Sequence, residues 1–335
     1  MTQTMYLLTG AAGNLGSNIS RQLVNKGCSV RALVLPNDKA VRYVPTEADI
    51  CFGDIMDNAS LEQFFTVPEN TSVIVIHCAS IVTVDPSFQQ KVYDINVTGT
   101  KNIIQKCLEH NVEKLVYISS TGAIPEQPGH TLIKEVSAFE PQKVIGCYSQ
   151  SKALASQAVL DAVKEHDLNA CIICPSGICG PNDYSFGEAA TVICDVVNGK
   201  MPVGIAGSFN LCDVRDLADG VIKACDRGQK GECYIFGNKP VTLKEFSQVI
   251  ADVSNCKPIR FFLPIPLANA IAKLMEVRAK RTGKPTILTT FAVYNLARNN
   301  HFDSSKAQKE LGYCTRPFIQ TISDEVRWLQ AEGKC

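Results

Sequence analysis

Tyr148 and Lys152 are the two residues whose types and spacing best fit chemistry. Both precede a run of good helix formers, Ala153–Ala158, so we expect them on one helix. Positions four apart lie on one face of a helix, so the phenol and the ammonium can reach the same point. A nearby positive charge stabilises a phenolate and lowers the tyrosine pKa from its ordinary value of about 10. The pair therefore predicts a proton donor and acceptor, while two solvated residues on an exposed helix are the alternative.

A glycine-rich turn follows the first predicted strand. The apolar stretch Tyr6–Thr9 runs directly into Gly10-Ala11-Ala12-Gly13-Asn14-Leu15-Gly16, and a helical pattern then continues to Gly27. Glycines at such a turn permit positive φ and let a pyrophosphate approach the backbone. The N-terminus of the next helix offers free N–H groups to an anion. This arrangement predicts a dinucleotide site, and a purely structural turn is the alternative.

The second predicted strand, Ser29–Leu35, ends without the acidic residue that would bind the ribose hydroxyls of NAD. Arg31, Lys39 and Arg42 lie near this end and could meet a 2′-phosphate. We therefore expect NADP as the cofactor, with NAD possible, whereas solvated surface charges are the alternative reading of these cations.

Two further strands should lie along the cofactor. A strand near Asp49–Phe52 leads into Asp54 and Ile55, which suit the edge and face of an adenine, although Asp54 could instead cap a helix. The strand Val73–His77 leads into the small residues Cys78-Ala79-Ser80, over which a flat cofactor could lie.

Polar residues also end two strands. Lys114–Ile118 leads into Ser119 and Ser120, whose hydroxyls stand where open α/β sheets place ligand groups. The same hydroxyls could cap the next turn instead. We expect His77, at the end of its strand, to have a structural role.

The elements that carry these residues alternate strand and helix through the first ~180 residues, which predicts an α/β fold with a Rossmann-type doubly wound parallel sheet. From Asn182 the pattern becomes helix-rich, and we expect a smaller C-terminal substrate lobe. The predicted dinucleotide-binding domain comprises residues 1–181 and 210–237, and the predicted substrate lobe comprises residues 182–209 and 238–335. We expect the apolar stretch Phe261–Leu267 and the helix Leu267–Arg281 to form the core of this lobe, with contact to a membrane or an apolar substrate as the alternative.

Taken together, the motifs resemble those of the extended short-chain dehydrogenase/reductase (NAD-dependent epimerase/dehydratase) family. The resemblance is strongest to the branch of dihydroflavonol reductases and 3β-hydroxysteroid dehydrogenases, and it extends to the sugar-nucleotide epimerases. The stretches that carry it are Gly10-x-x-Gly13-x-x-Gly16, Ser119-Ser120, Tyr148-x-x-x-Lys152, Pro175-Ser176-Gly177-Ile178-x-Gly180-Pro181, Asp213–Ala218 and Ser304–Tyr313.

The resemblance implies a role for each matching residue. Tyr148 would be the general acid/base, and Lys152 would lower its pKa and hold the nicotinamide ribose. Ser120 would hydrogen-bond the substrate oxygen, with Ser119 or Thr121 as substitutes, and Asn96 would order a proton-relay water. The residues expected to bind the cofactor are Gly10, Gly13, Asn14, Leu15, Gly16, Arg42, Asp54, Ile55, Cys78, Ala79, Ser80, Ser119, Tyr148, Lys152, Pro175 and Ile178.

The implied activity is hydride transfer that interconverts a ketone or aldehyde and a secondary alcohol on a mostly apolar small molecule. A sugar-nucleotide epimerase or dehydratase is the first alternative, and it would need cations for a diphosphate. The nearby candidates for that task are Lys200, Arg215, Arg278 and Arg281. A non-catalytic cofactor-binding regulator is the second alternative, but such chains usually lose the tyrosine or the lysine.

The composition limits the classes of partner that we expect for the chain. Lys plus Arg and Asp plus Glu both number 33, so the chain lacks the basic surplus of a nucleic-acid binder. Fifteen cysteines, mostly in apolar stretches, suggest free thiols in a reducing interior. Cys171 and Cys174 would face opposite sides of a strand, so we expect no metal site. The sequence also predicts no transmembrane segment and a cytoplasmic location. The resemblance implies a homodimer through the helices of Asn96 and Tyr148.

Overall fold

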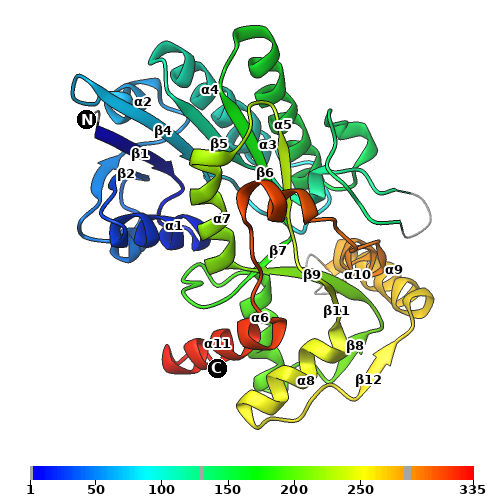
Figure 1. Cartoon of the computed structure of the whole chain (residues 1–335). Helices are drawn as coiled ribbons and strands as arrows, with labels where there is room; N and C mark the ends of the chain where they lie inside the picture. The colour runs from blue at the N-terminus through cyan, green and yellow to red at the C-terminus, as the bar shows by residue number, and fades with distance from the viewer. Residues whose placement is uncertain (1–2, 128–130, 283–287) are drawn as a thin grey trace.

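A parallel sheet with helices on both faces forms the centre of the computed structural model, which describes residues 3–127, 131–282 and 288–335 (Figure 1). Its strands are β1 (Gln3–Thr9), β2 (Ser29–Val34), β3 (Asp49–Phe52), β4 (Thr71–His77), β5 (Lys114–Ile118), β6 (Ala170–Pro175) and β10 (Cys233–Phe236). Across the described residues they run in the order β10-β6-β5-β4-β1-β2-β3. The order reverses direction between β1 and β4, which is the point where doubly wound sheets bind ligands. The predicted Rossmann-type fold is confirmed.

Burial on both faces explains the composition of the central strands. Every residue of β5 and of β6 is buried, so these strands read as continuous apolar runs and not as alternating ones. Cys171 and Cys174 pack into the cores on opposite faces of the sheet, as the strand spacing predicts.

Five long helices cover the sheet: α1 (Asn14–Asn25), α2 (Asn58–Phe65), α4 (Thr100–Glu109), α5 (Cys147–His166) and α7 (Val214–Arg227). Helices α1 and α7 share one core with the sheet, and α2, α4 and α5 share the other. In Figure 1 the pair α1 and α7 lies in front of the sheet, and α4 and α5 lie behind it. The carboxyl ends of the strands therefore receive loops from both layers.

The remaining elements include two small sheets, β11-β9-β7 and β12-β8, and a helical part. The strands are β7 (Gly177–Cys179), β8 (Val203–Ile205), β9 (Ser208–Asp213), β11 (Pro240–Thr242) and β12 (Phe261–Leu263). The helices are α3 (Gln90–Tyr93), α6 (Glu188–Val197), α8 (Leu243–Ser254), α9 (Ile265–Thr282), α10 (Thr290–Ala297) and α11 (Phe318–Ala331). Short helical segments are η1 (Lys39–Tyr43), η2 (Asp94–Gly99), η3 (Thr121–Ala123), η5 (Pro141–Lys143) and η6 (Ala307–Leu311). A third core, under α6, α8 and α11, confirms the helix-rich C-terminal part.

Near its C-terminal end, after α10, the chain returns to the central sheet. Ala307, Leu311 and Tyr313 pack into the same core as α1 and α7, and the ring of Tyr313 stacks on Phe236 of β10 with centroids 4.3 Å apart. The division of the chain into two domains remains a prediction, and its residues 1–2, 128–130 and 283–287 lie outside the described residues.

Helix α9 differs from the expected core helix. Its buried residues are the small Ala268 and Ala272, which pack against Val293 of α10. Its large apolar residues Leu267 and Leu274 are exposed instead. The expectation of a core helix is therefore wrong for this outer face, because tertiary packing turned the alanines and not the leucines inward.

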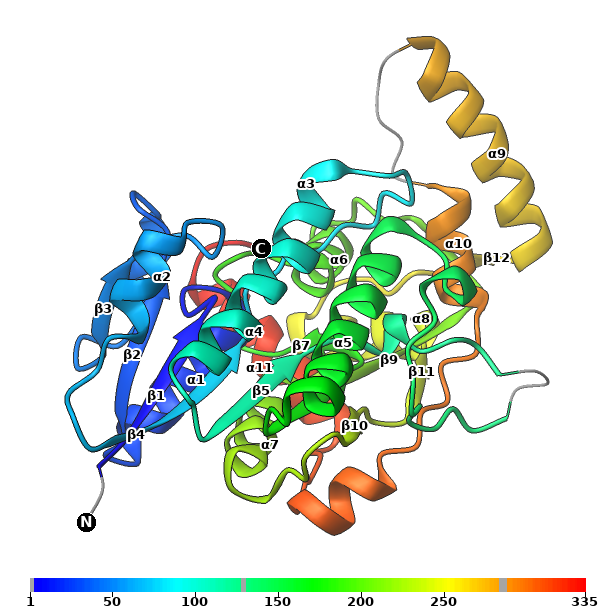
Figure 2. The ribbon, with the colours of Figure 1, turned by 90° about the horizontal axis from the view of Figure 1, so that it is seen from above.

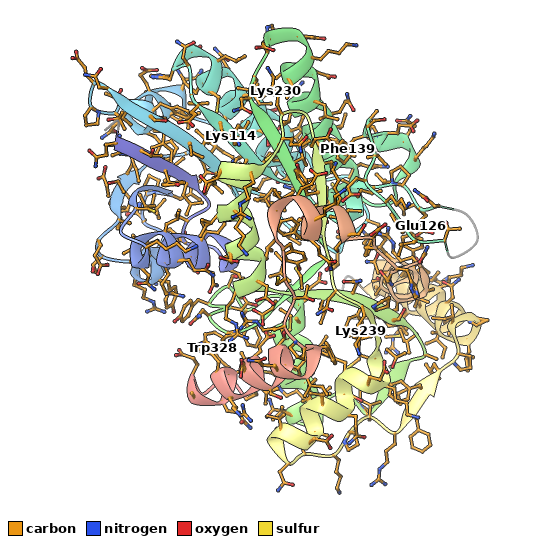
Figure 3. All side chains as sticks on the ribbon, viewed as in Figure 1. Lys114, Glu126, Phe139, Lys230, Lys239 and Trp328 are labelled. Atoms are coloured by element: carbon orange, nitrogen blue, oxygen red, sulfur yellow. The ribbon has the colours of Figure 1, made fainter. Side chains whose placement is uncertain are left out.

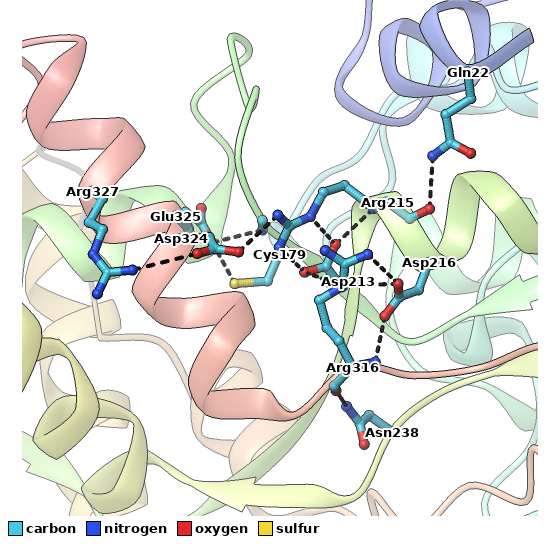
Figure 4. A network of polar contacts seen from close by, with 11 residues as sticks. Gln22, Cys179, Asp213, Arg215, Asp216, Asn238, Arg316, Asp324, Glu325 and Arg327 are labelled. Atoms are coloured by element: carbon cyan, nitrogen blue, oxygen red, sulfur yellow. Dashed lines mark hydrogen bonds and ion pairs between the residues drawn. The ribbon is translucent and has the colours of Figure 1, made fainter. Parts of the chain in front are cut away.

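A polar network joins α7 to α11 and to the segment before it (Figure 4). Arg215 donates to Asp213 at 2.7 Å and to Asp324 at 2.9 Å. Arg316 donates to Asp216 at 2.6 Å. Because Arg215 already serves two carboxylates, it is not available for the diphosphate that the epimerase alternative would require.

Glu325 lies in the interior beside this network. Its Oε2 accepts from the backbone N–H of Gly180 at 2.8 Å and from the thiol of Cys179. Its Oε1 is buried without a hydrogen-bond partner among the described residues. Burial is the main cause that raises the pKa of Glu325 to about 8, so this carboxyl group is mostly protonated at neutral pH.

No helix in the described ranges combines the length and the apolar character needed to cross a membrane.

Candidate active site

Two positions in the turn between β1 and α1, Gly10 and Gly16, admit only glycine. Gly10 has φ +66°, and a Cβ on it would lie 2.7 Å from the backbone nitrogen of Ala79. A Cβ on Gly16 would lie 2.1 Å from the carbonyl oxygen of Gly10. Gly13 donates its N–H to the same carbonyl at 3.0 Å. The turn and the end of β4 therefore meet closely, as dinucleotide-binding folds require.

The start of α1 has the features of an anion site. The helix begins at Asn14, and no described side chain caps its first N–H groups. The Oδ1 of Asn14 is buried and has no hydrogen-bond partner among the described residues. Leu15 contributes to the core behind the turn. Free N–H groups, an open acceptor and the glycine cradle fit the pyrophosphate and ribose of a dinucleotide.

Asp54 and Ile55 occupy the loop after β3. Asp54 accepts from the N–H of Met56 at 2.9 Å, so part of its carboxylate serves the turn. Ile55 is buried, and a Cβ on Gly99 would lie 2.4 Å from its Cδ1. This close contact between Ile55 and Gly99 ties the loop to the helix that carries Asn96.

Of the three cations near β2, Arg31 is bound to other residues of the chain, whereas Lys39 and Arg42 are exposed. Arg31 donates to Asp49 at 2.6 Å and to the carbonyl of Thr66 at 2.6 Å, because strand pairing places it against β3. It is therefore not free to bind a 2′-phosphate. Arg42 is exposed and donates to the hydroxyl of Tyr43 at 2.6 Å, and Lys39 is exposed in the same segment η1.

His77 links the end of β4 to its neighbours. Thr100 donates its hydroxyl to the carbonyl of Asn96 at 2.7 Å, so it must accept from Nε2–H of His77 at 3.0 Å. Nδ1 of His77 then accepts from the hydroxyl of Thr9 at 2.7 Å, and Thr9 accepts from the N–H of Ala79 at 3.2 Å. Burial, with a smaller effect of Lys152, lowers the pKa of His77 to about 3. These contacts of the neutral ring agree with the structural role expected for His77.

This chain of hydrogen bonds holds the strip Cys78-Ala79-Ser80 against the glycine turn. The N–H of Cys78 donates to the carbonyl of Thr9 at 3.3 Å. All three side chains are partly exposed. The strip therefore has a fixed backbone and open side chains, as a surface for a flat ligand needs.

Tyr148, Ser120 and Lys152 come together at the start of α5. The neighbouring hydroxyl of Ser120 favours a lower pKa of Tyr148. Burial outweighs it and raises the pKa of Tyr148 to about 12, so the phenol is protonated at neutral pH. Ser120 also accepts from the N–H of Gly122 at 3.0 Å, so it caps η3 as well.

Lys152 lies one helical turn after Tyr148 on α5 and is buried. Its Nζ donates to the carbonyl of Ile118 at 2.5 Å and lies 4.7 Å from the ring centroid of Tyr117. Burial lowers the pKa of Lys152 to about 8, so the ammonium is still mostly charged at pH 7. The net effect on Tyr148 is nevertheless a raised pKa, which differs from the lowering expected from the sequence. The reason is that desolvation of the phenol dominates.

Asn96 and Ser119 have side chains with internal partners. Asn96 accepts from the N–H of Ile81 at 2.7 Å and donates to Ser151 of α5 at 3.0 Å. The hydroxyl of Ser119 lies 2.6 Å from that of Ser156. Both residues thus fix α5 to the loops at the carboxyl ends of β4 and β5, next to the catalytic candidates.

Pro175 and Ile178 lie at the end of β6 and in β7. Pro175 is buried and pairs with Phe236, and Ile178 pairs with Cys212. Between them, the hydroxyl of Ser176 is buried and has no hydrogen-bond partner among the described residues. Ser176 was not among the predicted site residues, although it stands inside the Pro-Ser-Gly-Ile stretch.

Glu188 is a second residue that sequence reasoning missed. It is the first residue of α6, and its negative charge contributes to the raised pKa of Tyr148. Desolvation raises the pKa of Glu188 itself, although part of its surface is exposed. Its signal in the sequence is only an acid in the first turn of a helix, which is commonplace.

Helix α10 approaches the site from the C-terminal part. A Cβ on Gly146 would lie 2.7 Å from Cζ of Phe291 on α10, directly before α5 begins. Glu126 accepts from the hydroxyl of Tyr294 at 2.6 Å and pairs with Arg298 at 3.2 Å. Figure 3 shows Glu126 beside this helix. The C-terminal part is thus anchored at the start of the helix that carries Tyr148.

Comparison with known proteins gives consistent matches along the chain. Residues 6–237 match the NAD dependent epimerase/dehydratase family. Sterol demethylase protein B of Methylococcus capsulatus is 26% identical over 332 residues, 98% of each chain. The decarboxylating sterol-4-alpha-carboxylate 3-dehydrogenase of Schizosaccharomyces pombe is 27% identical over 352 residues, 100% of each chain. The solved structure of gox2253 has a TM-score of 0.85 and 30% identity, covering 100% of this chain and 99% of that one.

Proposed function

Since the chain belongs to the NAD dependent epimerase/dehydratase family, as its motifs indicate, we propose that it interconverts a ketone or aldehyde and a secondary alcohol on a mostly apolar small molecule with NAD(P). The observation that carries this proposal is that the hydroxyl of Ser120 neighbours Tyr148, with the buried Lys152 one helical turn further along α5. A regulator without activity would have no need to keep this arrangement.

The residues have distinct tasks in the reductive direction. Ser120 donates a hydrogen bond to the substrate oxygen, on which negative charge grows. Tyr148 donates the proton, and its raised pKa keeps it in the acid form at neutral pH. Lys152 supplies a fixed positive charge from within the protein. A bound nicotinamide cofactor supplies or accepts the hydride.

The cofactor would lie along the glycine turn, with Gly10, Gly13 and Gly16 at its pyrophosphate and Asp54 and Ile55 at its adenine. Pro175, Ile178 and the strip Cys78–Ser80 would line its nicotinamide half. NADP is the proposed form, because the exposed Arg42 and Lys39 stand after β2, where an NAD enzyme usually presents an acid.

Two observations favour an apolar substrate. The relatives from Methylococcus capsulatus and Schizosaccharomyces pombe are named for sterols. Near the site, Ile145 and Phe186 are exposed and Phe291 packs at the start of α5. Pairing of two copies through the helices of Asn96 and Tyr148 is a separate part of the proposal, which sedimentation velocity tests.

The test is Tyr148→Phe, which removes one oxygen from the site. We expect turnover of a panel of ketones and secondary alcohols to fall about 10²–10⁴-fold, because a positioned acid/base group contributes that much. Calorimetric affinity for NADP should change far less than turnover. Tyr93→Phe is the matched control. The hydroxyl of Tyr93 donates to Gln150, which lies on α5 with Tyr148, at 3.3 Å.

Three results would contradict the proposal. Equal activity of the two variants would remove Tyr148 from the chemistry. Turnover of a nucleotide sugar without net change in cofactor absorbance would establish the epimerase alternative. Tight cofactor binding without turnover of any substrate class would favour the regulator.

A further inference from the structure

The outer face of α9 carries the side chains that a core helix would bury. Leu274 is 72% exposed, and Leu267, Met275 and Val277 are exposed as well. The inward face is made by Ala268 and Ala272. Since large apolar side chains gain most from leaving water, this inverted arrangement indicates a second apolar environment outside the chain.

Further exposed apolar residues lie near this face. Phe261 of β12, 71% exposed, comes four residues before α9 begins and pairs with the exposed Val203 of β8. Val82, Val84 and Phe88 are exposed in the loop before α3. Figure 2 shows α9 standing out from the body on the same side as α3. One flat apolar surface could therefore contact both segments.

The exposed charges that the structure describes on α9 have one sign. The exposed ionisable side chains that the structure describes on this helix are Lys273, Arg278 and Arg281. The acid Glu276 is half-buried and accepts from the N–H of Thr290 at 2.7 Å and from its hydroxyl at 2.9 Å. This excess contrasts with the whole chain, in which 33 basic residues balance 33 acidic ones. Long basic side chains can keep their charge in water while their stems lie along apolar surface.

We propose that the outer face of α9, with the loop before α3, docks on a lipid bilayer that contains anionic lipids. The leucines and Val277 enter the boundary between headgroups and acyl chains, and Lys273 and Arg281 meet the headgroup phosphates. A second copy of the chain is disfavoured as the occupant, because a symmetric contact through α9 would bring its cations against themselves. The docking holds α9, and with it α10 beside the start of α5, at a surface in which apolar molecules dissolve.

The experiment is vesicle co-sedimentation of the full chain with phosphatidylglycerol–phosphatidylcholine vesicles and with phosphatidylcholine alone. We expect binding to the anionic vesicles that weakens as salt is raised. Leu274→Glu should lower the partition coefficient roughly tenfold or more, because it replaces a membrane-facing apolar group with a charge. Ile319→Glu is the matched control, since Ile319 is 63% exposed on α11, and it should bind like the unchanged protein.

Four outcomes would overturn the docking. The unchanged protein could fail to bind anionic vesicles at low salt. Leu274→Glu could bind as well as the unchanged protein, or the control could lose binding equally. Sedimentation velocity could instead show self-association that Leu274→Glu abolishes. Thermal unfolding and cofactor calorimetry on both variants establish that any loss does not come from misfolding, as expected for two exposed positions.

Discussion

At the scale of single residues, His77 illustrates how a buried titratable group can serve the site without touching a ligand. It joins β1, β4 and the start of α4 through Thr9 and Thr100, and each hydroxyl has a fixed direction of donation. Protonation would give Nδ1 a hydrogen that points at the hydroxyl hydrogen of Thr9, so Thr9 could accept it only by turning its own hydrogen away. The neutral ring is therefore part of the folded state.

We predict that His77 makes the protein sensitive to acid. The unfolded chain binds a proton at His77 near pH 6.5, whereas the folded chain binds it only near 3. The stabilisation that comes from neutral His77 is thus fully present above pH 6.5 and is lost as the pH falls toward 3. In His77→Gln this loss is absent, so the difference in unfolding free energy between the two proteins should shrink on acidification by a few kcal/mol at most. Urea unfolding at several pH values measures it. A constant difference would show that His77 does not titrate with unfolding.

Residue types and local spacing were sufficient to find much of the candidate site. Tyr148 and Lys152 share a helix, and Ser120 follows a parallel strand, so their meeting was predictable from the carboxyl ends of the sheet. The partner of Arg31 was not predictable, because it depends on the register between β2 and β3. Nor was the raised pKa of Tyr148, since desolvation depends on the packing of the whole site.

At the scale of elements, the glycines in the turn between β1 and α1 are needed for different reasons. Gly16 is required by the fold, because a Cβ there would collide with the backbone of Gly10 at 2.1 Å. Gly13 is exposed, and a Cβ there would meet the same oxygen at 3.3 Å. The fold can therefore tolerate a side chain at Gly13 far better than at Gly16.

We predict that Gly16→Ala and Gly13→Ala fail in different ways. Gly16→Ala should lower the unfolding free energy by about 1–3 kcal/mol, the usual cost of overpacking. Gly13→Ala should keep its thermal stability within a few degrees but bind NADP at least roughly tenfold more weakly, because in the proposed cofactor placement its methyl group would stand where the pyrophosphate approaches. Differential scanning fluorimetry and calorimetry measure the two effects. Unchanged affinity of Gly13→Ala would move the pyrophosphate away from this turn.

Element types were easier to predict than element orientation. The sheet strands and α5 follow from apolar runs and helix formers that lie close together in the sequence. Helix α9 was also predicted, but its leucines were assigned to the core. Which face is buried depends on Val293 and the other residues of α10 that pack on it, and no periodicity in α9 alone specifies them.

At the scale of the whole molecule, Glu325 and His77 act on stability in opposite directions. The unfolded chain releases the proton of Glu325 near pH 4.5, whereas the folded chain keeps it to about 8. The contribution of Glu325 is fully present below 4.5 and is lost as the pH rises through 8. Taken with His77, these two groups favour maximal stability at mildly acidic pH.

We predict that Glu325→Gln moves this maximum to higher pH. A neutral amide can still accept from Gly180 but has no proton to lose, so the variant should gain stability over the unchanged protein as the pH rises from 4.5 to 8. The gain should be on the order of a few kcal/mol, since each pKa unit corresponds to about 1.4 kcal/mol. Thermal unfolding from pH 4 to 9 measures it. Parallel curves for the two proteins would contradict the raised pKa.

The late strand β10 has a consequence for synthesis on the ribosome. It adds to the sheet beside β6 but lies some distance further along the chain, and Tyr313 then stacks on Phe236 from further still. The nascent N-terminal part therefore emerges with the edge of β6 unpaired until β10 is translated, and with one core unfilled until Tyr313 is translated. Such an exposed edge is a site for incorrect pairing. Emergence of the segment with Tyr313, and not completion of the glycine turn, should be the step at which the nascent protein becomes resistant to protease.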